Sequence, residues 1–331
     1  MISKISDPAA DGVDVDVKQE WGYYTSFKDD DDGGNAQNSG AYIFRPETPD
    51  QDLIKMTPDP SKTRVYRSPL VAEVHAGFVE PWIRQIVRIR KGQPYVEVEY
   101  SVGPIPVGDG RGREVVARLT SGIDSRGTFY TDSNAREFVR RSRGSRPTWD
   151  LRETQPVAGN YYPVNAAVYL EDDRASLSVS VDRSQGGSSL TDGALELMVH
   201  RRTLGDDGRG VGEPMNETDA GMSHYPPYGD ATRYGDGVVA TGIHRIMIGG
   251  GGGGASSARS LMDGMFSPPH LFATTAPTGR DLPFQSSSFS ALDVELPENV
   301  MLLTLSRIGA AAADDDDGTL TLLVRLAHQY A

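Results

Sequence analysis

Hydrophobic and polar residues alternate with a period of two along much of the chain. The clearest case is YVEVEYSV at residues 95–102, where Val96, Val98 and Tyr100 fall on one face. Successive side chains point to opposite faces of a β-strand, so this pattern predicts a strand with one buried face. Four more segments have this character, and Gly, Pro, Asn and Asp clusters separate them: residues 176–181, 194–200, 301–308 and 320–328.

No segment carries a sustained helical pattern with capping residues at its ends. Many short strands between turn clusters are typical of stacked antiparallel sheets. The sequence therefore predicts an all-β protein, an antiparallel β-sandwich that occupies residues 15–331. Residues 1–14 are expected to form a poorly ordered segment.

Three tracts of low complexity interrupt the alternation: DDDDGGNAQNSG at 29–40, GGGGGGASSA at 249–258 and AAAADDDDG at 310–318. Glycine is conformationally free and neighbouring aspartates repel one another, so such tracts bury too little surface to offset ordering. We predict mobile loops near these residues. The aspartate runs lack the spacing of an EF-hand loop, which disfavours a calcium site.

Composition removes several classes of function. The formal net charge is −13, which repels a phosphate backbone and argues against a nucleic-acid partner. There are no cysteines, which excludes thiol catalysis, disulfides and zinc–thiolate sites. No run approaches the roughly 18–20 apolar residues that a membrane span needs, and the N-terminus lacks the apolar core of a signal peptide.

Several stretches resemble short catalytic motifs but lack residues that those motifs require. SQGGSSL at 184–190 lacks the lysine of a P-loop and precedes a strand, so we expect a tight turn there. Ser188 and Ser189 lack the glycines of a nucleophile elbow. The six histidines never adopt a spacing that places two metal ligands together: His75, His200, His224, His244, His270 and His328. We predict no catalytic residue and no metal ligand in this chain.

Polar clusters beside aromatic residues are more informative. HRRTLGDDGRGVGEP at 200–214 follows a strand and presents Asp207 and Arg209 among glycines. GTFYTDSN at 127–134 and GNYYPVN at 159–165 place aromatic rings beside Asp and Asn. Such groups suit a sugar ring, which needs an apolar contact and charged hydrogen-bond partners. Buried tyrosines with turn-forming Asp and Asn fit the same spacing, so both interpretations stay open.

At these residues the sequence resembles glycoside hydrolase family 38, in particular the C-terminal half of lysosomal-type α-mannosidases. The resemblance runs from about Val15 to the last residues and is thin through the glycine-rich region. It recovers at LLTLSRI and LLVRLAHQYA. Six motifs carry it by their order and spacing: SGAYIFRP (39–46), EYSVGPIPVGD (99–109), FYTDSN (129–134), PVAGNYYPVN (156–165), DRSQGGSSL (182–190) and ELMVHRRTLGDDGRGVGEP (196–214).

The resemblance implies a sandwich of the galactose-mutarotase-like supersandwich type, packed against an N-terminal α/β domain. It also implies retaining hydrolysis of terminal α-mannosyl linkages, in which one carboxylate forms a glycosyl-enzyme and another acts as acid and base. Zinc grips the sugar hydroxyls in the family. Because the family's nucleophile and zinc ligands belong to the N-terminal half, this chain alone is predicted to be inactive.

Two residues, Tyr42 and Arg209, match family positions at the bound mannose. Tyr42 and Arg209 are expected to reach the sugar, and Asp207 is expected to support the arginine. Asn216 begins the glycosylation sequon NET. The resemblance further implies α-mannosides or N-glycan oligosaccharides as substrates, the N-terminal catalytic half as a partner, and the lysosome, vacuole or secretory lumen as location. The alternative is a stand-alone β-sandwich module that binds carbohydrate or has a structural role.

Overall fold

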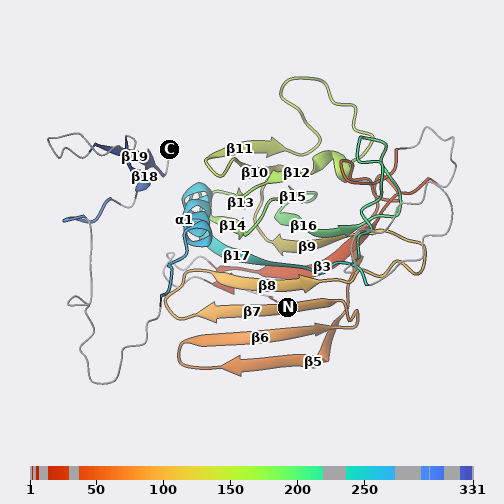
Figure 1. Ribbon diagram of the computed structural model, residues 1–331, viewed down its shortest axis with the longest axis horizontal. Helices are drawn as coiled ribbons and strands as arrows, with labels where there is room; N and C mark the ends of the chain where they lie inside the picture. Colours follow the sequence, from red (N-terminus) through yellow and green to blue (C-terminus); the bar gives the residue numbers. More distant parts are fainter. Residues whose placement is uncertain are drawn as a thin grey trace, which may run out of the picture. The chain divides into compact units, whose positions relative to one another are not determined.

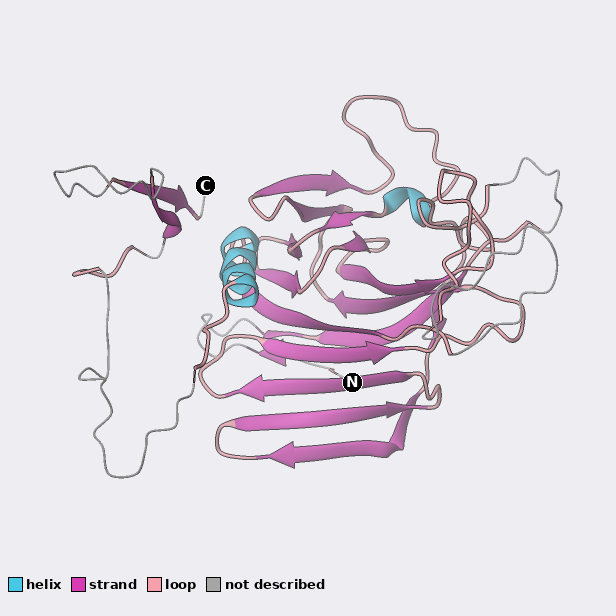
Figure 2. Ribbon diagram, in the orientation of Figure 1, coloured by secondary structure: helices cyan, strands magenta, loops and turns pink. Residues whose placement is uncertain are grey.

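Antiparallel β-strands dominate the chain (Figures 1 and 2). The computed structural model describes residues 2, 5–6, 14–29, 37–218, 236–272, 292–297, 299–308 and 321–329. The chain divides into two compact units, residues 1–266 and residues 267–331. The prediction of an all-β, antiparallel fold is confirmed.

The larger sheet of the first unit has nine strands. Every neighbouring pair in it is antiparallel. In spatial order the strands are β11 (Glu137–Ser142), β10 (Thr128–Ser133), β13 (Ala167–Glu171), β14 (Ala175–Val181), β17 (Ala240–Gly250), β8 (Val96–Val102), β7 (Ile83–Arg90), β6 (Val71–Phe78) and β5 (Pro58–Arg67).

The smaller sheet of this unit has six strands and is also antiparallel throughout. A short 3-10 turn, Ala158–Asn160, precedes its first edge strand. In spatial order the strands are β12 (Tyr162–Val164), β15 (Gln185–Ser188), β16 (Ala194–Arg202), β9 (Arg113–Ser121), β3 (Val17–Thr25) and β4 (Ile54–Lys55).

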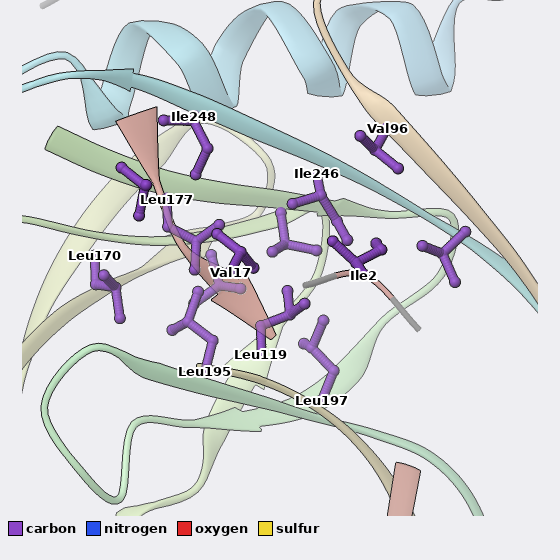
Figure 3. Close-up of a cluster of buried hydrophobic side chains, with 14 of the residues drawn as sticks. Ile2, Val17, Val96, Leu119, Leu170, Leu177, Leu195, Leu197, Ile246 and Ile248 are labelled. Carbon is purple, nitrogen blue, oxygen red and sulfur yellow. The ribbon is translucent and has the colours of Figure 1, made fainter. Parts of the chain in front are cut away.

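The two sheets stack through their apolar faces. Val17, Leu119, Leu195 and Leu197 of the six-stranded sheet belong to one buried cluster with residues of the nine-stranded sheet (Figure 3). Burying each large apolar side chain contributes about 1.5–3 kcal/mol, so this layer is the main source of stability. The partners from the nine-stranded sheet include Val96, Val98, Leu170, Leu177, Val179, Ile246 and Ile248.

One helix, α1 (Gly254–Phe266), packs on the nine-stranded sheet beside β13, β14 and β17 (Figure 1). It buries Ala258, Leu261 and Met262, which lie on one face at helical spacing. Ala258 and Met262 pack with Tyr169 of β13. The structure differs here from the mobile loop predicted at 249–258, because β17 ends within this tract and α1 begins in it. The helix was not predicted because its apolar stripe is short and lies among glycines and serines, which are typical of loops.

The DRSQGGSSL stretch also differs from the expected tight turn. Gln185–Ser188 form strand β15, which pairs with β12 and β16. A Cβ on Gly187 would lie 2.6 Å from Cγ2 of Val164, so the paired glycines allow β12 to approach closely. The glycines belong to a close strand contact rather than to a turn.

The remaining predictions have mixed outcomes. Of residues 1–14, the structure describes four: Ile2 is buried, and β1 (Ile5–Ser6) pairs with β2 (Asp14–Val15). Poor order of the segment as a whole stays a prediction. Asp29 and residues 37–40 lie outside strands as expected. Residues 30–36 and 310–318 lie outside the described residues. In the second unit, β18 (Val300–Arg307) and β19 (Leu322–His328) form an antiparallel hairpin, as the alternation predicted.

Candidate functional site

Two loops that follow strands of the six-stranded sheet hold the predicted sugar contacts. The first, here called the Tyr42 loop, comprises residues 39–45 and follows β3. Ser39 N–H donates to Phe27 O at 3.0 Å, and Phe27 N–H donates to Arg45 O at 2.9 Å. Both ends of the loop are therefore tied to the chain that leaves β3, and Tyr42 at its tip is 64% exposed. The second, here called the Arg209 loop, comprises residues 205–210 and follows β16.

The carboxylate of Asp207 joins the two loops. Its Oδ2 accepts hydrogen bonds from the backbone N–H of Tyr42 at 2.6 Å and of Ile43 at 2.9 Å. Its Oδ1 accepts one from the backbone N–H of Arg209 at 3.1 Å. Asp207 is only 3% exposed, and hydrogen bonds to a charged group are among the stronger ones in proteins. One buried carboxylate thus fixes the backbone beside both predicted sugar contacts.

Further contacts press the loops together. Asn38 Nδ2 donates to the backbone oxygen of Asp206 at 3.0 Å, and Gln37 Nε2 donates to the backbone oxygen of Asp207. A Cβ on Gly40 would lie 2.8 Å from Cβ, Cγ and the backbone N of Asp207. The approach leaves no room for a side chain at residue 40, so the SGAY motif requires glycine for packing.

Arg209 is exposed, and the glycines that flank it shape its loop. Gly208 has φ of +66° and Gly210 has φ of +130°, values that side-chain-bearing residues rarely adopt. Within the described residues, the Arg209 guanidinium forms no ion pair with Asp206 or Asp207. Asp207 supports Arg209 through the backbone N–H, and the guanidinium stays accessible.

Beneath the Tyr42 loop lies a buried carboxylate that sequence reasoning missed. Glu114 of β9 is 0% exposed and faces away from the core between the sheets. It accepts from Ser39 Oγ and, at 3.1 Å, from Arg201 Nε. Burial raises the pKa of this carboxyl, and the neighbouring Arg201 opposes that shift. The only signal in the sequence is the pair of charges at the ends of two apolar strands, REVVARL and ELMVHRR.

A second buried carboxylate lies farther along the same face. Glu196 of β16 is 1% exposed and accepts from Arg118 Nε at 2.6 Å and from Tyr161 Oη at 2.6 Å. Tyr24 Oη donates to it at 3.0 Å. Burial, and then the Glu196 charge, raise the pKa of Tyr161 well above its ordinary value. This cluster bonds to tyrosines and not to the Tyr42 loop.

A groove of about 560 Å³ opens next to these clusters. This volume falls within the range of small-molecule sites, and Tyr42 and Arg201 belong to its lining, whereas Asp207 and Arg209 do not. The lining residues are Tyr42, Phe44, Tyr161, Tyr162, Pro163, Ser184, Gln185, Gly186, Met198, Val199, His200, Arg201 and Met215.

Within the aromatic segments, Asp132 and Asn160 have structural roles. Asp132 is buried, and its Oδ1 accepts from the backbone N–H of Asn165, Ala166 and Ala167 at 2.8–3.0 Å. Asn160 is also buried and accepts from Gly144 N–H at 2.8 Å. For Asp132 and Asn160 these contacts favour the turn-forming interpretation, whereas Tyr161 and Tyr162 line the groove.

The sequon residue Asn216 is buried at 6% exposure. Its Oδ1 accepts from Nε of the buried Arg202 at 2.8 Å. A glycan on Nδ2 would occupy a packed position, so modification of Asn216 stays a prediction. If it occurs, attachment before folding is the route that the packing allows.

The described residues do not fit a metal centre, because no group of three or more His, Asp or Glu side chains in this part of the chain is placed to hold an ion. Separately, among the helices that the structure describes, none is long and apolar enough to cross a membrane.

Comparison with known proteins places the chain in a family context. Residues 2–209 match the family described as "Glycosyl hydrolases family 38 C-terminal domain". The chain is 44% identical over 300 residues to the lysosomal alpha-mannosidase of Felis catus, a match that covers 90% of this chain and 27% of that protein. It is 41% identical to the alpha-mannosidase of Canavalia ensiformis, covering 96% of this chain and 30% of that protein. The chain therefore spans less than a third of the length of these relatives.

A solved structure from Enterococcus faecalis, titled as a protein in glycosyl hydrolase family 38, has a similar fold. The TM-score is 0.58 at 13% sequence identity, with 99% of this chain and 38% of that chain covered.

Proposed function

The chain belongs to glycoside hydrolase family 38, as its C-terminal domain, and we propose that it completes the substrate site of an α-mannosidase. The enzyme removes terminal α-mannosyl residues from glycans such as N-linked oligosaccharides. This chain supplies sugar contacts, and a separate N-terminal half supplies the nucleophile, the acid–base carboxylate and zinc. Hydrolysis proceeds with retention through a glycosyl-enzyme.

The observation that carries the proposal is the junction of the Tyr42 and Arg209 loops. These loops lie far apart in the sequence, yet Asp207 binds backbone N–H groups of both. Tyr42 is exposed at one loop tip, and Arg209 lies between glycines on the other. In a site closed by the catalytic half, the Tyr42 hydroxyl and the Arg209 guanidinium donate hydrogen bonds to sugar hydroxyls. Each charge-assisted bond contributes about 1.5–3 kcal/mol.

The relatives named as lysosomal alpha-mannosidases support a location in the lysosome, the vacuole or the secretory lumen. A second candidate function is a stand-alone sandwich that binds carbohydrate or has a structural role. The groove beside Tyr42 supports it, because a groove of this size could hold a sugar without a catalytic partner.

Two preparations test the division of labour. The isolated 331-residue chain should not hydrolyse an aryl α-mannoside above background, even with added zinc. A chimeric enzyme, in which this chain replaces the matching region of the Canavalia ensiformis alpha-mannosidase, should hydrolyse it. Turnover by the isolated chain, surviving stringent purification, would show that it holds its own nucleophile. An inactive but folded chimera, together with mannoside binding by the isolated chain, would favour the stand-alone module.

A further inference from the structure

We propose that Glu114 and Arg201 are positioning residues that hold the Tyr42 loop in the geometry that sugar binding requires. This inference rests on the proposed function, because only there does Tyr42 contact the substrate. It goes further by assigning a role to an ion pair that itself makes no contact with the sugar.

A β-bulge brings the two residues together. The register of β16 on β9 shifts between Met198 and His200, so that Arg201 lies opposite Glu114. Continued without the shift from Met198 opposite Val116, the pairing would set His200 against Glu114 instead. Bulges re-aim side chains next to functional sites. Here the extra residue places the guanidinium of Arg201 against the buried carboxylate of Glu114.

From this pair, hydrogen bonds reach the loop at two points. Glu114 accepts from Ser39 Oγ, and Arg201 Nη2 donates to the backbone oxygen of Ile43 at 2.7 Å. Ser39 Oγ in turn accepts from Arg45 N–H at 2.9 Å. The first residue, the last residue and the middle of the loop are therefore all tied to Glu114 or its partner.

Glu114 and Arg201, here called the clamp, act together with Asp207 on the backbone of Ile43, the residue that follows Tyr42. Ile43 N–H donates to Asp207 Oδ2 at 2.9 Å, while Ile43 O accepts from Arg201. The backbone is thus held from the Arg209 loop and from the sheet, yet the Tyr42 side chain remains 64% exposed. A fixed backbone that displays a free side chain is the arrangement that preorganised binding needs.

Stability alone does not account for the pair. Burying a carboxylate is costly, and a well-packed apolar pair of similar volume is often as stable or more so. Besides bonding to each other, Glu114 and Arg201 form hydrogen bonds with the Tyr42 loop. Glu196 and Arg118 instead form theirs with Tyr24 and Tyr161. Because the rings of Tyr24 and Tyr161 contact Phe44 of the Tyr42 loop, Glu97 is the better matched control: it is 4% exposed, and its partners Arg90 and Arg245 lie in the nine-stranded sheet.

The test is a double-mutant cycle in the chimeric enzyme. Glu114→Gln should lower kcat/KM by about tenfold, mostly through kcat, since misplacing a contact group carries penalties of this order or more. Tyr42→Ala should lower it at least as far. In the double variant, Glu114→Gln should add no further loss, because its effect passes through Tyr42. Losses that multiply, or wild-type kinetics in a folded Glu114→Gln variant, would overturn the positioning role.

Two further measurements test the same positioning role. Ser39→Ala removes the contacts of its Oγ with Glu114 and Arg45 without unpairing a charge, so the variant should fold. Its loss of kcat/KM should be smaller than that of Glu114→Gln and should again disappear when Tyr42 is already alanine. A loss that multiplies with that of Tyr42→Ala also overturns the proposal. In the isolated chain, Glu114→Gln should speed hydrogen exchange at the amides of Tyr42 and Ile43, and Glu97→Gln should not. If Tyr42→Ala has wild-type kinetics, the proposed function of Tyr42 itself fails, which separates that outcome from failure of the clamp alone.

Discussion

Both sheets carry Glu–Arg ion pairs on their outer faces, but the two sets of pairs differ in how far loops cover them. On the nine-stranded sheet, Arg88 pairs with Glu73 at 2.6 Å and with Glu99, and Glu73 and Glu99 have side chains 26% and 44% exposed. On the six-stranded sheet, loops cover Glu114 and Glu196, which are at most 1% exposed. The exposed ladder stitches neighbouring strands together. The covered carboxylates reach side chains and loops far away in the sequence. Glu97 of the nine-stranded sheet is only 4% exposed, yet its partners Arg90 and Arg245 lie in the same sheet, so a covering loop, and not burial alone, lets a Glu–Arg pair organise parts of the chain beyond its own sheet.

The largest expected effect comes from unpairing a covered carboxylate. Glu196→Ala leaves Arg118 without its anion and removes the acceptor of the Tyr24 and Tyr161 hydroxyls. Breaking a buried pair in this way costs about 3–5 kcal/mol. Urea unfolding of the isolated chain measures the loss. A change below about 1 kcal/mol would mean that the covered pairs behave like surface pairs.

The buried histidine His244 is expected to make the stability of the fold depend on pH. Desolvation lowers the pKa of His244 in β17 to about 4, from an ordinary value of 6.5. The unfolded chain therefore binds a proton first as the pH falls from 6.5 towards 4, and stability present above this window is lost within it. The loss amounts to roughly 3 kcal/mol at the acid end.

His244→Gln should remove this component. The free energy of unfolding, measured in urea at several pH values, should fall less steeply for the variant than for the native chain between pH 6.5 and pH 4. Parallel curves would show that His244 does not titrate differently in the folded and unfolded chains.

The contact between the two loops is open to a steric test. Gly40→Ala places a methyl group against Asp207, where both backbone and side-chain atoms lie 2.8 Å away. Overpacking of this kind costs about 1–3 kcal/mol and should also speed amide exchange at Tyr42. Gly108→Ala is the matched control, because nothing lies within 4 Å of a Cβ there. Equal behaviour of the two variants would contradict the close approach.

The smallest effect is expected on the exposed ladder. Glu99→Gln removes one partner of Arg88, whose Nε remains paired with Glu73. Exposed pairs contribute about 0–1 kcal/mol, so the urea midpoint should hardly move. A loss as large as that of Glu196→Ala would erase the distinction between the two faces.

The sequence predicts the strands well because alternation is a local signal. The segments at 95–102, 176–181 and 194–200 lie where β8, β14 and β16 are found. It predicts the burial of three acidic side chains poorly, because Glu97, Glu114 and Glu196 are charged residues within strands, where a charge is typical of a solvent-facing position. Their burial depends on long-range partners: arginines of neighbouring strands for Glu97, and loops from elsewhere in the chain for the other two.

The candidate site was partly accessible from the sequence for a different reason. Tyr42, Asp207 and Arg209 came from the family resemblance, and the structure joins their backbones through one carboxylate. Nothing local pairs residue 114 with residue 201, since the β-bulge that sets their register is a property of two strands together. α1 was missed because its short apolar stripe lies within a glycine- and serine-rich stretch.

The most direct test of the central claim is Arg209→Lys in the chimeric enzyme. Lysine keeps the positive charge but loses the planar fork that binds two oxygens at once. If Arg209 donates to sugar hydroxyls in a closed site, kcat/KM should fall by about tenfold or more, equivalent to about 1.4 kcal/mol, while the melting temperature stays unchanged. Wild-type kinetics in this variant would contradict the account and leave Arg209 as a surface residue.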